Sequence, residues 1–111
     1  MKSMVKLYIL DEAGEKVFGE GPFRLLQATA EHGSLRRAAI SMDMAYSKAR
    51  KLITTAENAY GFPLLVPTIG GKTGGGSVLT PECEALMEKY ARYRKECKAA
   101  NERIYGEIFG E

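Results

Sequence analysis

Hydrophobic and polar residues alternate at the start of the chain, which is the pattern of a half-buried β-strand. Residues 5–10 read VKLYIL and residues 16–18 read KVF, with the polar stretch DEAGE between them. Two such runs joined by a short glycine-containing turn are typical of an antiparallel hairpin. We therefore expect an N-terminal β-hairpin over residues 5–18.

The spacing of apolar residues then changes from two to three and four, which indicates helix. Pro22 suits the first turn of a helix, and Gly33 suits the left-handed residue that ends one. The apolar side chains between them are Phe23, Leu26 and Ala30. We expect a first helix between this proline and this glycine.

Two further helical patterns follow, separated by a short turn. Ser34 is a good N-cap for a short helix whose apolar side, Ala38 and Ala39, is small enough for another helix to approach closely. The next pattern covers residues 45–60 and has a basic and hydroxylic outer face. This arrangement predicts a helix-turn-helix with residues 45–60 as the recognition helix. The side chains of the whole helix-turn-helix that are expected to reach DNA are Ser34, Arg36, Tyr46, Ser47, Lys48, Arg50, Lys51 and Thr54.

A glycine-rich stretch follows this unit and holds five of the chain's twelve glycines within residues 70–76. Its Gly-Lys-Thr sequence is part of a nucleotide-binding P-loop motif, but Val66 stands where that motif requires glycine, and three further glycines prevent a helix from starting after Thr73. The flanking apolar pieces PLLV and SVL instead predict a hairpin, the wing of a winged helix-turn-helix, over residues 67–77. Its expected phosphate contacts are Thr68, Lys72, Thr73 and Ser77.

The last residues predict one long helix with a regular apolar seam. Thr80 can cap this helix, and Pro81 suits its first position. Apolar side chains recur every three or four residues, at Cys83, Leu86, Tyr90, Tyr93, Cys97, Ala100 and Ile104. Because a heptad seam is typical of helices that pair, we expect residues 1–80 to bind DNA and residues 81–111 to form a dimerisation helix. The expected interface residues of this homodimer are Leu86, Tyr90, Tyr93, Cys97 and Ile104.

The distribution of charge also favours a polyanion as partner. Residues 34–80 contain six basic residues against two acidic ones, whereas the flanking segments are nearly balanced and the whole chain carries a net charge of +2. A localised basic segment is the electrostatic footprint of a nucleic-acid-binding protein. The fold class that accommodates these elements is mainly α with small β-hairpins (α+β).

Several other classes are not expected. No apolar run approaches the roughly 18 residues of a membrane span, and no cleavable leader is recognisable, so we expect a cytoplasmic protein that does not bind membranes. Cys83 and Cys97 have no histidine or further cysteine nearby at metal-ligand spacing, so neither a metal nor another cofactor is expected. No nucleophile has a partner base and no carboxylate pair falls on one face, so we do not expect an enzyme.

The same residues resemble a known family. The order GEG, LLQATAEHGSLRRAAISMDMAYSKAR, GFPLLV and GGKTGGGSVLTP is similar to the N-terminal DNA-binding domain of ModE-type molybdate-responsive transcription regulators, whose winged helix is related to that of LysR-type regulators. The most specific features are Gly33-Ser34 before an alanine pair and the glycine run around Lys72. This chain departs from the family pattern at Ala45, where serine is usual, and at Arg50, where tryptophan is usual.

The resemblance implies a dimeric, sequence-specific protein that binds double-stranded DNA, with its last helix joining two subunits. Such a homodimer is expected to recognise a palindromic operator. Members of the family continue into a C-terminal oxyanion-binding domain, so no molybdate site is expected within these 111 residues. The alternative that stays open is a small dimeric module that binds an anionic ligand or a partner protein through the Gly-Lys loop.

Overall fold

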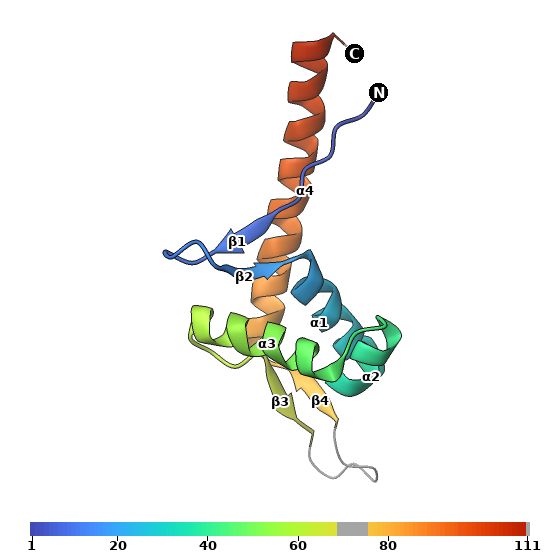
Figure 1. Cartoon of the computed structure of the whole chain (residues 1–111), viewed down its shortest axis with the longest axis vertical. Helices are drawn as coiled ribbons and strands as arrows, with labels where there is room; N and C mark the ends of the chain where they lie inside the picture. Colours follow the sequence, from blue (N-terminus) through green and yellow to red (C-terminus); the bar gives the residue numbers. More distant parts are fainter. Residues whose placement is uncertain (69–75, 111) are drawn as a thin grey trace.

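The computed structural model in Figure 1 describes residues 1–68 and 76–110 of the chain. Within these residues the elements follow the order β1, β2, α1, α2, α3, β3, β4 and α4, and the strands form two separate antiparallel hairpins. Helices α1 to α3 form a compact body, one hairpin lies on either side of α3, and α4 projects away from this body (Figure 1). The expected fold class, mainly α with small β-hairpins, is confirmed.

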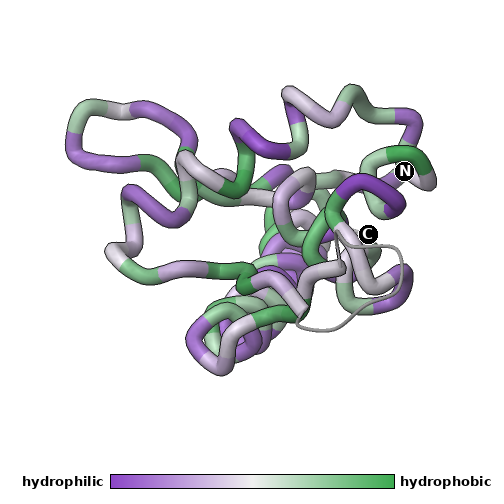
Figure 2. Tube along the Cα trace, turned by 90° about the horizontal axis from the view of Figure 1, so that it is seen from below, coloured by the Kyte–Doolittle hydropathy of each residue, from purple (hydrophilic) through white to green (hydrophobic). Residues whose placement is uncertain are grey.

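The N-terminal hairpin pairs β1 (Tyr8–Leu10) with β2 (Lys16–Gly19). Asp11 stabilises the turn, because its Oδ1 atom accepts hydrogen bonds from the backbone N–H groups of Ala13 and Glu15, both at 2.9 Å. Seen from below in Figure 2, this hairpin projects to one side, with hydrophilic residues around its loop. The predicted hairpin is therefore present, although its first strand begins at Tyr8 rather than at residue 5.

Helix α1 spans Glu20–His32, so it starts earlier than the sequence pattern predicts. Gly33 ends it with a φ of 78°, as expected. The predicted buried side is wrong at one position, because Ala30 is exposed while Thr29 is fully buried. Thr29 is tolerated in the core because its hydroxyl donates a hydrogen bond of 2.8 Å to the carbonyl of Leu25 in the same helix.

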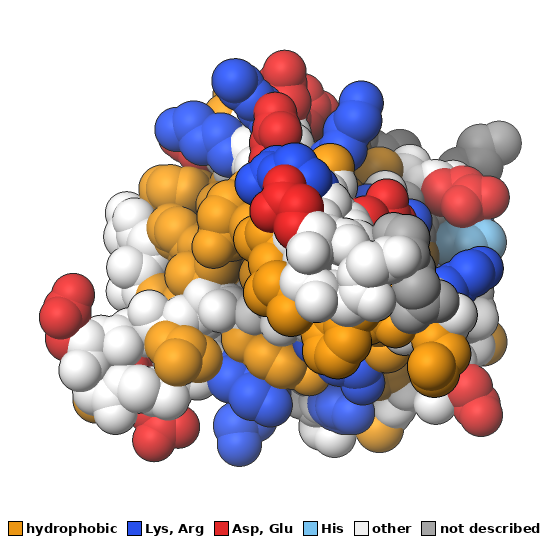
Figure 3. Space-filling model, turned by 90° about the horizontal axis from the view of Figure 1, so that it is seen from above, with side chains coloured by type: hydrophobic (Ala, Val, Ile, Leu, Met, Phe, Trp, Pro, Cys, Tyr) orange, Lys and Arg blue, Asp and Glu red, His pale blue; other side chains and the backbone are white. Residues whose placement is uncertain are grey.

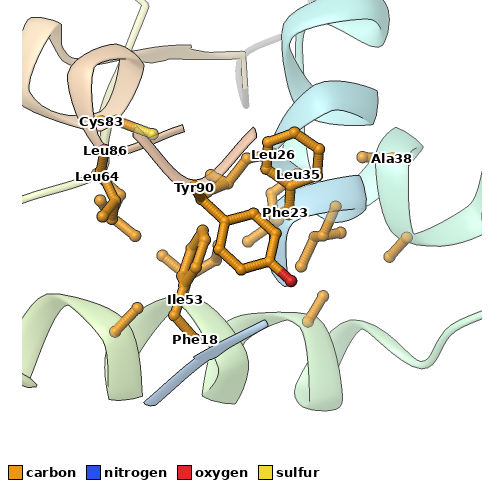
Figure 4. Packing of buried hydrophobic residues seen from close by; sticks show 14 residues of the cluster. Phe18, Phe23, Leu26, Leu35, Ala38, Ile53, Leu64, Cys83, Leu86 and Tyr90 are labelled. Carbon is orange, nitrogen blue, oxygen red and sulfur yellow. The ribbon is translucent and has the colours of Figure 1, made fainter. Parts of the chain in front are cut away.

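The hydrophobic core lies between the helical body and the first turns of α4 (Pro81–Phe109). Figure 4 shows the Tyr90 ring beside Phe18 and Phe23, with ring centroids 5.2 and 5.1 Å apart. Cys83 is also completely buried in this core. The first turns of α4 thus complete the core of the winged unit instead of standing apart from it.

The predicted dimer seam on α4 consequently divides into two parts. Leu86 and Tyr90 are only 9% and 2% exposed within their own subunit, so we correct their assignment to an interface between subunits. The seam continues beyond the core with Tyr93 and Ile104, which are 52% and 45% exposed, and with the half-buried Cys97. A heptad pattern cannot distinguish these two environments, because both require apolar side chains at the same spacing.

Residues 1–7 have no regular secondary structure and lie beside the projecting part of α4, so that the two ends of the chain are close together (Figure 1). The Tyr90 hydroxyl donates a hydrogen bond of 3.3 Å to the Leu7 carbonyl, and the Asn101 side-chain amide donates one of 3.1 Å to the Ser3 carbonyl. The molecule measures 59 × 29 × 24 Å, and α4 accounts for its elongation. None of the helices within residues 1–68 and 76–110 combines the length and the apolar character that crossing a membrane requires.

Candidate nucleic-acid interface

Helices α2 (Leu35–Ser41) and α3 (Tyr46–Tyr60) form the predicted helix-turn-helix. Helix α3 matches the expected recognition helix over residues 45–60, except that residue 45 is its N-cap. The turn contains Asp43 at a φ of 53°, a left-handed conformation that aspartate adopts more readily than most residues. The alanines between the helices are almost completely buried, at Ala38, Ala39 and Ala49. Their small size lets α2 pack closely enough to fix the direction of α3.

Ser34 supports this unit as a cap. Its Oγ atom accepts a hydrogen bond of 3.0 Å from the backbone N–H of Arg37, which confirms the N-cap expected for α2. The residue is only 8% exposed. We therefore assign Ser34 to holding the start of α2 and do not retain it among the candidate DNA contacts.

The outer face of α3 is polar and predominantly basic. Its exposed side chains among the predicted contacts are Ser47, Lys48, Arg50, Lys51 and Thr54. The carboxylate of Glu57 on the same helix is engaged locally, because its Oε2 atom accepts a hydrogen bond of 2.8 Å from the backbone N–H of Leu64. Among the described residues, no ion pair joins Glu57 to the cations of this face.

Tyr46 differs from the other predicted contacts because it is half-buried. The guanidinium carbon of Arg36 on α2 lies 4.1 Å from the centre of the Tyr46 ring, which is the geometry of a cation–π contact. This contact links the first turns of both helices and leaves Arg36 exposed. Arg36 and Tyr46 therefore lie together at the edge of the surface that α3 presents.

The hairpin predicted at the base of the wing is present, although its first strand covers residues 65–67 rather than 63–66. Strand β3 (Leu65–Pro67) pairs with β4 (Ser77–Leu79), and the wing base is tied to the α1–α2 junction by a hydrogen bond of 2.8 Å from the Ser77 N–H to the Gly33 carbonyl. Thr68 is exposed at the end of β3. The other expected wing contacts, Lys72 and Thr73, lie outside the described residues.

Two basic residues that the sequence reasoning omitted are exposed near this surface. Arg37 follows Arg36 on α2, and its position in the basic segment was the signal that could have identified it. Lys16 belongs to the N-terminal hairpin and lines a groove together with Lys48 and Lys51 of α3. No local sequence pattern indicates that Lys16 is close to α3, because the contact joins segments far apart in the chain.

Seen from above, lysine and arginine side chains lie along the lower edge beside the N-terminal hairpin and also on the opposite edge, where acidic side chains are mixed with them, whereas acidic side chains mark the tip of that hairpin (Figure 3). Solvent-exposed cations on one side of a small domain produce a positive potential that attracts a polyanion. The residues that carry this charge beside the hairpin are Lys16, Lys48 and Lys51.

Curated proteins of similar sequence carry molybdenum-related names. The chain is 35% identical over 78 residues to the molybdenum-pterin-binding protein MopA of Rhodobacter capsulatus, and 35% identical over 81 residues to the molybdenum transport protein ModE of Azotobacter vinelandii. These matches cover 70% and 73% of this chain. It is also 34% identical over 67 residues, or 60% of its length, to the transcriptional regulator ModE of Haemophilus influenzae. The matched part spans 29%, 30% and 26% of these three relatives.

Two further comparisons concern the fold. A solved structure described as "Crystal structure of CbnR_DBD-DNA complex" superposes with a TM-score of 0.62 at 19% sequence identity, covering 79% of this chain and 95% of the other. This likeness confirms the winged fold. The family model of the "Bacterial regulatory helix-turn-helix protein, lysR family" matches residues 22–84, which extend from α1 through the wing into α4. The chain thus belongs to the lysR family of bacterial regulatory helix-turn-helix proteins.

Proposed function

We propose that this protein is a transcriptional regulator that binds double-stranded DNA by inserting α3 into the major groove. The observation that carries this proposal is the exposed basic and hydroxylic face of α3, presented by a closely packed helix-turn-helix. Arginine, lysine, serine and threonine side chains donate hydrogen bonds to phosphates and base edges. The DNA-bound relative of similar fold and the relative named as a transcriptional regulator support the same function.

Within this proposal, the wing over residues 67–77 contacts the sugar–phosphate backbone. The Ser77–Gly33 hydrogen bond supports this role, because it fixes the base of the wing to the same junction that positions α2 and α3. Thr68 and Ser77 supply hydroxyl donors, and Lys72 supplies a charge. We infer that Lys72 and Thr73 contact phosphates and contribute to affinity for every sequence.

We further infer that the protein acts as a homodimer joined through the projecting part of α4. Tyr93, Ile104 and Ile108 are 52%, 45% and 71% exposed on a helix that extends beyond its own core. The N-terminal segment lies beside this part of α4 (Figure 1), and its Met1 and Met4 side chains are 97% and 79% exposed. Large apolar side chains that are exposed on a projecting helix are typical of an interface.

A two-fold symmetric dimer determines the form of the DNA site. Two recognition helices that enter successive major grooves are separated by about 34–36 Å along the duplex, and the bound sequence repeats with the symmetry of the protein. The proposed operator is therefore a palindrome with half-sites one helical turn apart.

Fluorescence anisotropy with labelled duplex DNA in a salt series tests the proposal. If a dimer neutralises six to eight phosphates, log affinity plotted against log salt has a slope of about −5 to −7. A pool of random duplexes selected by repeated binding should converge on a palindromic sequence. The absence of binding at micromolar protein and about 50 mM salt would refute the proposed function.

A further inference from the structure

A groove of about 610 Å³ separates the N-terminal hairpin from α3. Its walls include apolar side chains of both elements, such as Phe18 and Leu52, and three lysines open onto it. Among the described residues that line this groove, none is an aspartate or a glutamate. The lysines are Lys16 from the hairpin and Lys48 and Lys51 from α3.

Helix α3 therefore has two different flanks. On one flank, Glu57 accepts the hydrogen bond from Leu64 just before β3, so this side faces the base of the wing. On the other flank, Lys48, Lys51 and Thr55 line the groove with the hairpin. A helix that lies in a major groove about 12 Å wide has a sugar–phosphate strand on each side. The wing accounts for one of these strands only.

We propose that the lysine groove seats the second sugar–phosphate strand, with Lys16 of the N-terminal hairpin as a phosphate contact. This inference rests on the proposed DNA-binding function and extends it to an element outside the helix-turn-helix and the wing. Three ammonium groups without a carboxylate among the described lining residues are complementary to a run of phosphates. Lysine contacts phosphate as a point charge, so the contact adds affinity without reading sequence.

The position of Lys16 is already restricted before DNA binds. Its Nζ atom lies 4.1 Å from the centre of the Tyr8 ring on the neighbouring strand, which is cation–π geometry. Tyr8 lines the same groove. The ammonium group is thus held at the rim of the groove and loses less conformational freedom on binding than a lysine without such a contact.

A strand of DNA fits this groove better than a small organic anion does. Sites for small molecules enclose most of the surface of their ligand and present few charged groups. Here all three lysines are exposed to solvent, and the groove that they line is open to solvent rather than enclosed. An elongated polyanion can contact all three charges without being enclosed.

Lysine acetylation footprinting of the full chain tests the inference. The protein is treated with an acetylating reagent alone, with selected duplex DNA, or with sodium benzoate as a small anion, and each lysine is quantified by mass spectrometry. DNA is expected to slow acetylation of Lys16, Lys48 and Lys51 at least threefold, while Lys6 and Lys89, which are exposed and do not line the groove, serve as internal controls. Protection by benzoate without protection of Lys16 by DNA would assign the groove to a small anion and overturn the inference.

Substitution of Lys16 supplies an independent measurement. Lys16→Ala should weaken binding to all duplexes by about fivefold to tenfold at 0.1 M salt and reduce the salt slope by about 0.9 per bound subunit. Lys16→Arg should retain most of the affinity, and Lys6→Ala is the matched control. Circular dichroism verifies that the hairpin variants remain folded.

The outcomes separate the two proposals. Wild-type protein that binds DNA while Lys16→Ala keeps its affinity and salt slope would overturn the role of the hairpin and leave the proposed function intact. Failure of the wild-type chain to bind any duplex would reject the proposed function itself.

Discussion

The guanidinium group of Arg94 on α4 donates hydrogen bonds to both carboxylate oxygens of Glu20 at the start of α1, at 2.7 and 2.8 Å. The same group lies 4.8 Å from the centre of the Phe23 ring. Burial alone raises the pKa of the Glu20 carboxyl, but hydrogen bonds and charge from Arg94 and Arg24 outweigh it and lower that pKa below 4.5. The contact anchors α4 to α1 one turn beyond Tyr90, the last fully buried position of the seam.

Glu20→Gln is expected to lower the free energy of unfolding by about 0.5–1 kcal/mol at pH 7, a modest effect because both side chains are about two-fifths exposed. The folded-state pKa lies below the unfolded one, so the contribution is complete above about pH 4.5 and disappears as the pH falls through the folded pKa. Urea unfolding of the wild-type protein and the variant at neutral and acidic pH measures this contribution to the free energy of unfolding. Glu107→Gln, which removes only a surface pair of 3.6 Å with Arg103, is the control. Equal losses in both variants, or a difference that persists in acid, would contradict this prediction.

Tyr93→Glu is expected to shift the protein from dimer to monomer. It places a charge on the exposed seam of α4, where a symmetric partner would bring a second copy of that charge nearby and leave both poorly solvated. Light scattering coupled to size-exclusion chromatography at tens of micromolar measures the change. Ala99→Glu adds the same charge to an exposed position of α4 outside the seam and should leave the dimer intact. DNA affinity should fall steeply only for Tyr93→Glu, because a monomer cannot gain from binding two linked half-sites at once. A monomeric wild-type chain would show that the projecting helix has another purpose.

Arg50→Ala and Lys72→Ala are expected to have different effects on DNA binding. An arginine on a recognition helix can read guanine bidentately, so Arg50→Ala should cost about 1–3 kcal/mol and relax the preference at particular base pairs. Lys72→Ala should weaken all sequences alike and reduce the salt slope. Binding to a library of single-base operator variants distinguishes these outcomes. The same uniform loss in both variants would remove Arg50 from base recognition.

The thiol of Cys83 is expected to be unreactive in the folded protein. Burial, with smaller contributions from Glu84 and Glu57, raises its pKa to about 12, so only about one molecule in 10,000 carries the thiolate at pH 8. In a Cys97→Ser variant, a chromogenic disulfide reagent should label Cys83 only at the rate of unfolding, and at once in concentrated urea. Rapid labelling under native conditions would show that the first turns of α4 open locally.

The sequence predicts those parts of this fold that depend on local signals. Gly33 and Ser34 mark the boundary between α1 and α2 correctly, because a left-handed C-terminal residue and a hydroxyl N-cap each satisfy backbone groups at helix ends. The recognition helix and both wing strands are likewise determined by spacing and by glycine. These signals lie within a few residues of the structure that they specify.

The features that the sequence does not reveal arise from contacts between distant segments. Thr29 is buried and Ala30 exposed in a helix that packs mainly against α2 and β4, and the spacing of apolar residues alone cannot show which side of α1 faces these elements. Tyr90 has the same heptad position as a dimer contact, yet its ring packs against Phe18, far away in the chain. The proximity of Lys16 to α3 follows from the same folding of the hairpin onto the body.

Helix α4 is one uninterrupted element from Pro81 to Phe109, about 44 Å long, and its N-cap Thr80 also donates a hydrogen bond of 2.7 Å to the Pro63 carbonyl beside the wing. It can therefore act as a rigid lever with the DNA-reading elements fixed at one end. In a dimer held at the other end, a change of about 10° in the angle between the two helices changes the distance between the two recognition helices by about 5–8 Å, or roughly two base pairs. The packing angle of Tyr93, Cys97 and Ile104 would then determine which half-site spacing the protein accepts, without any change to α3 itself.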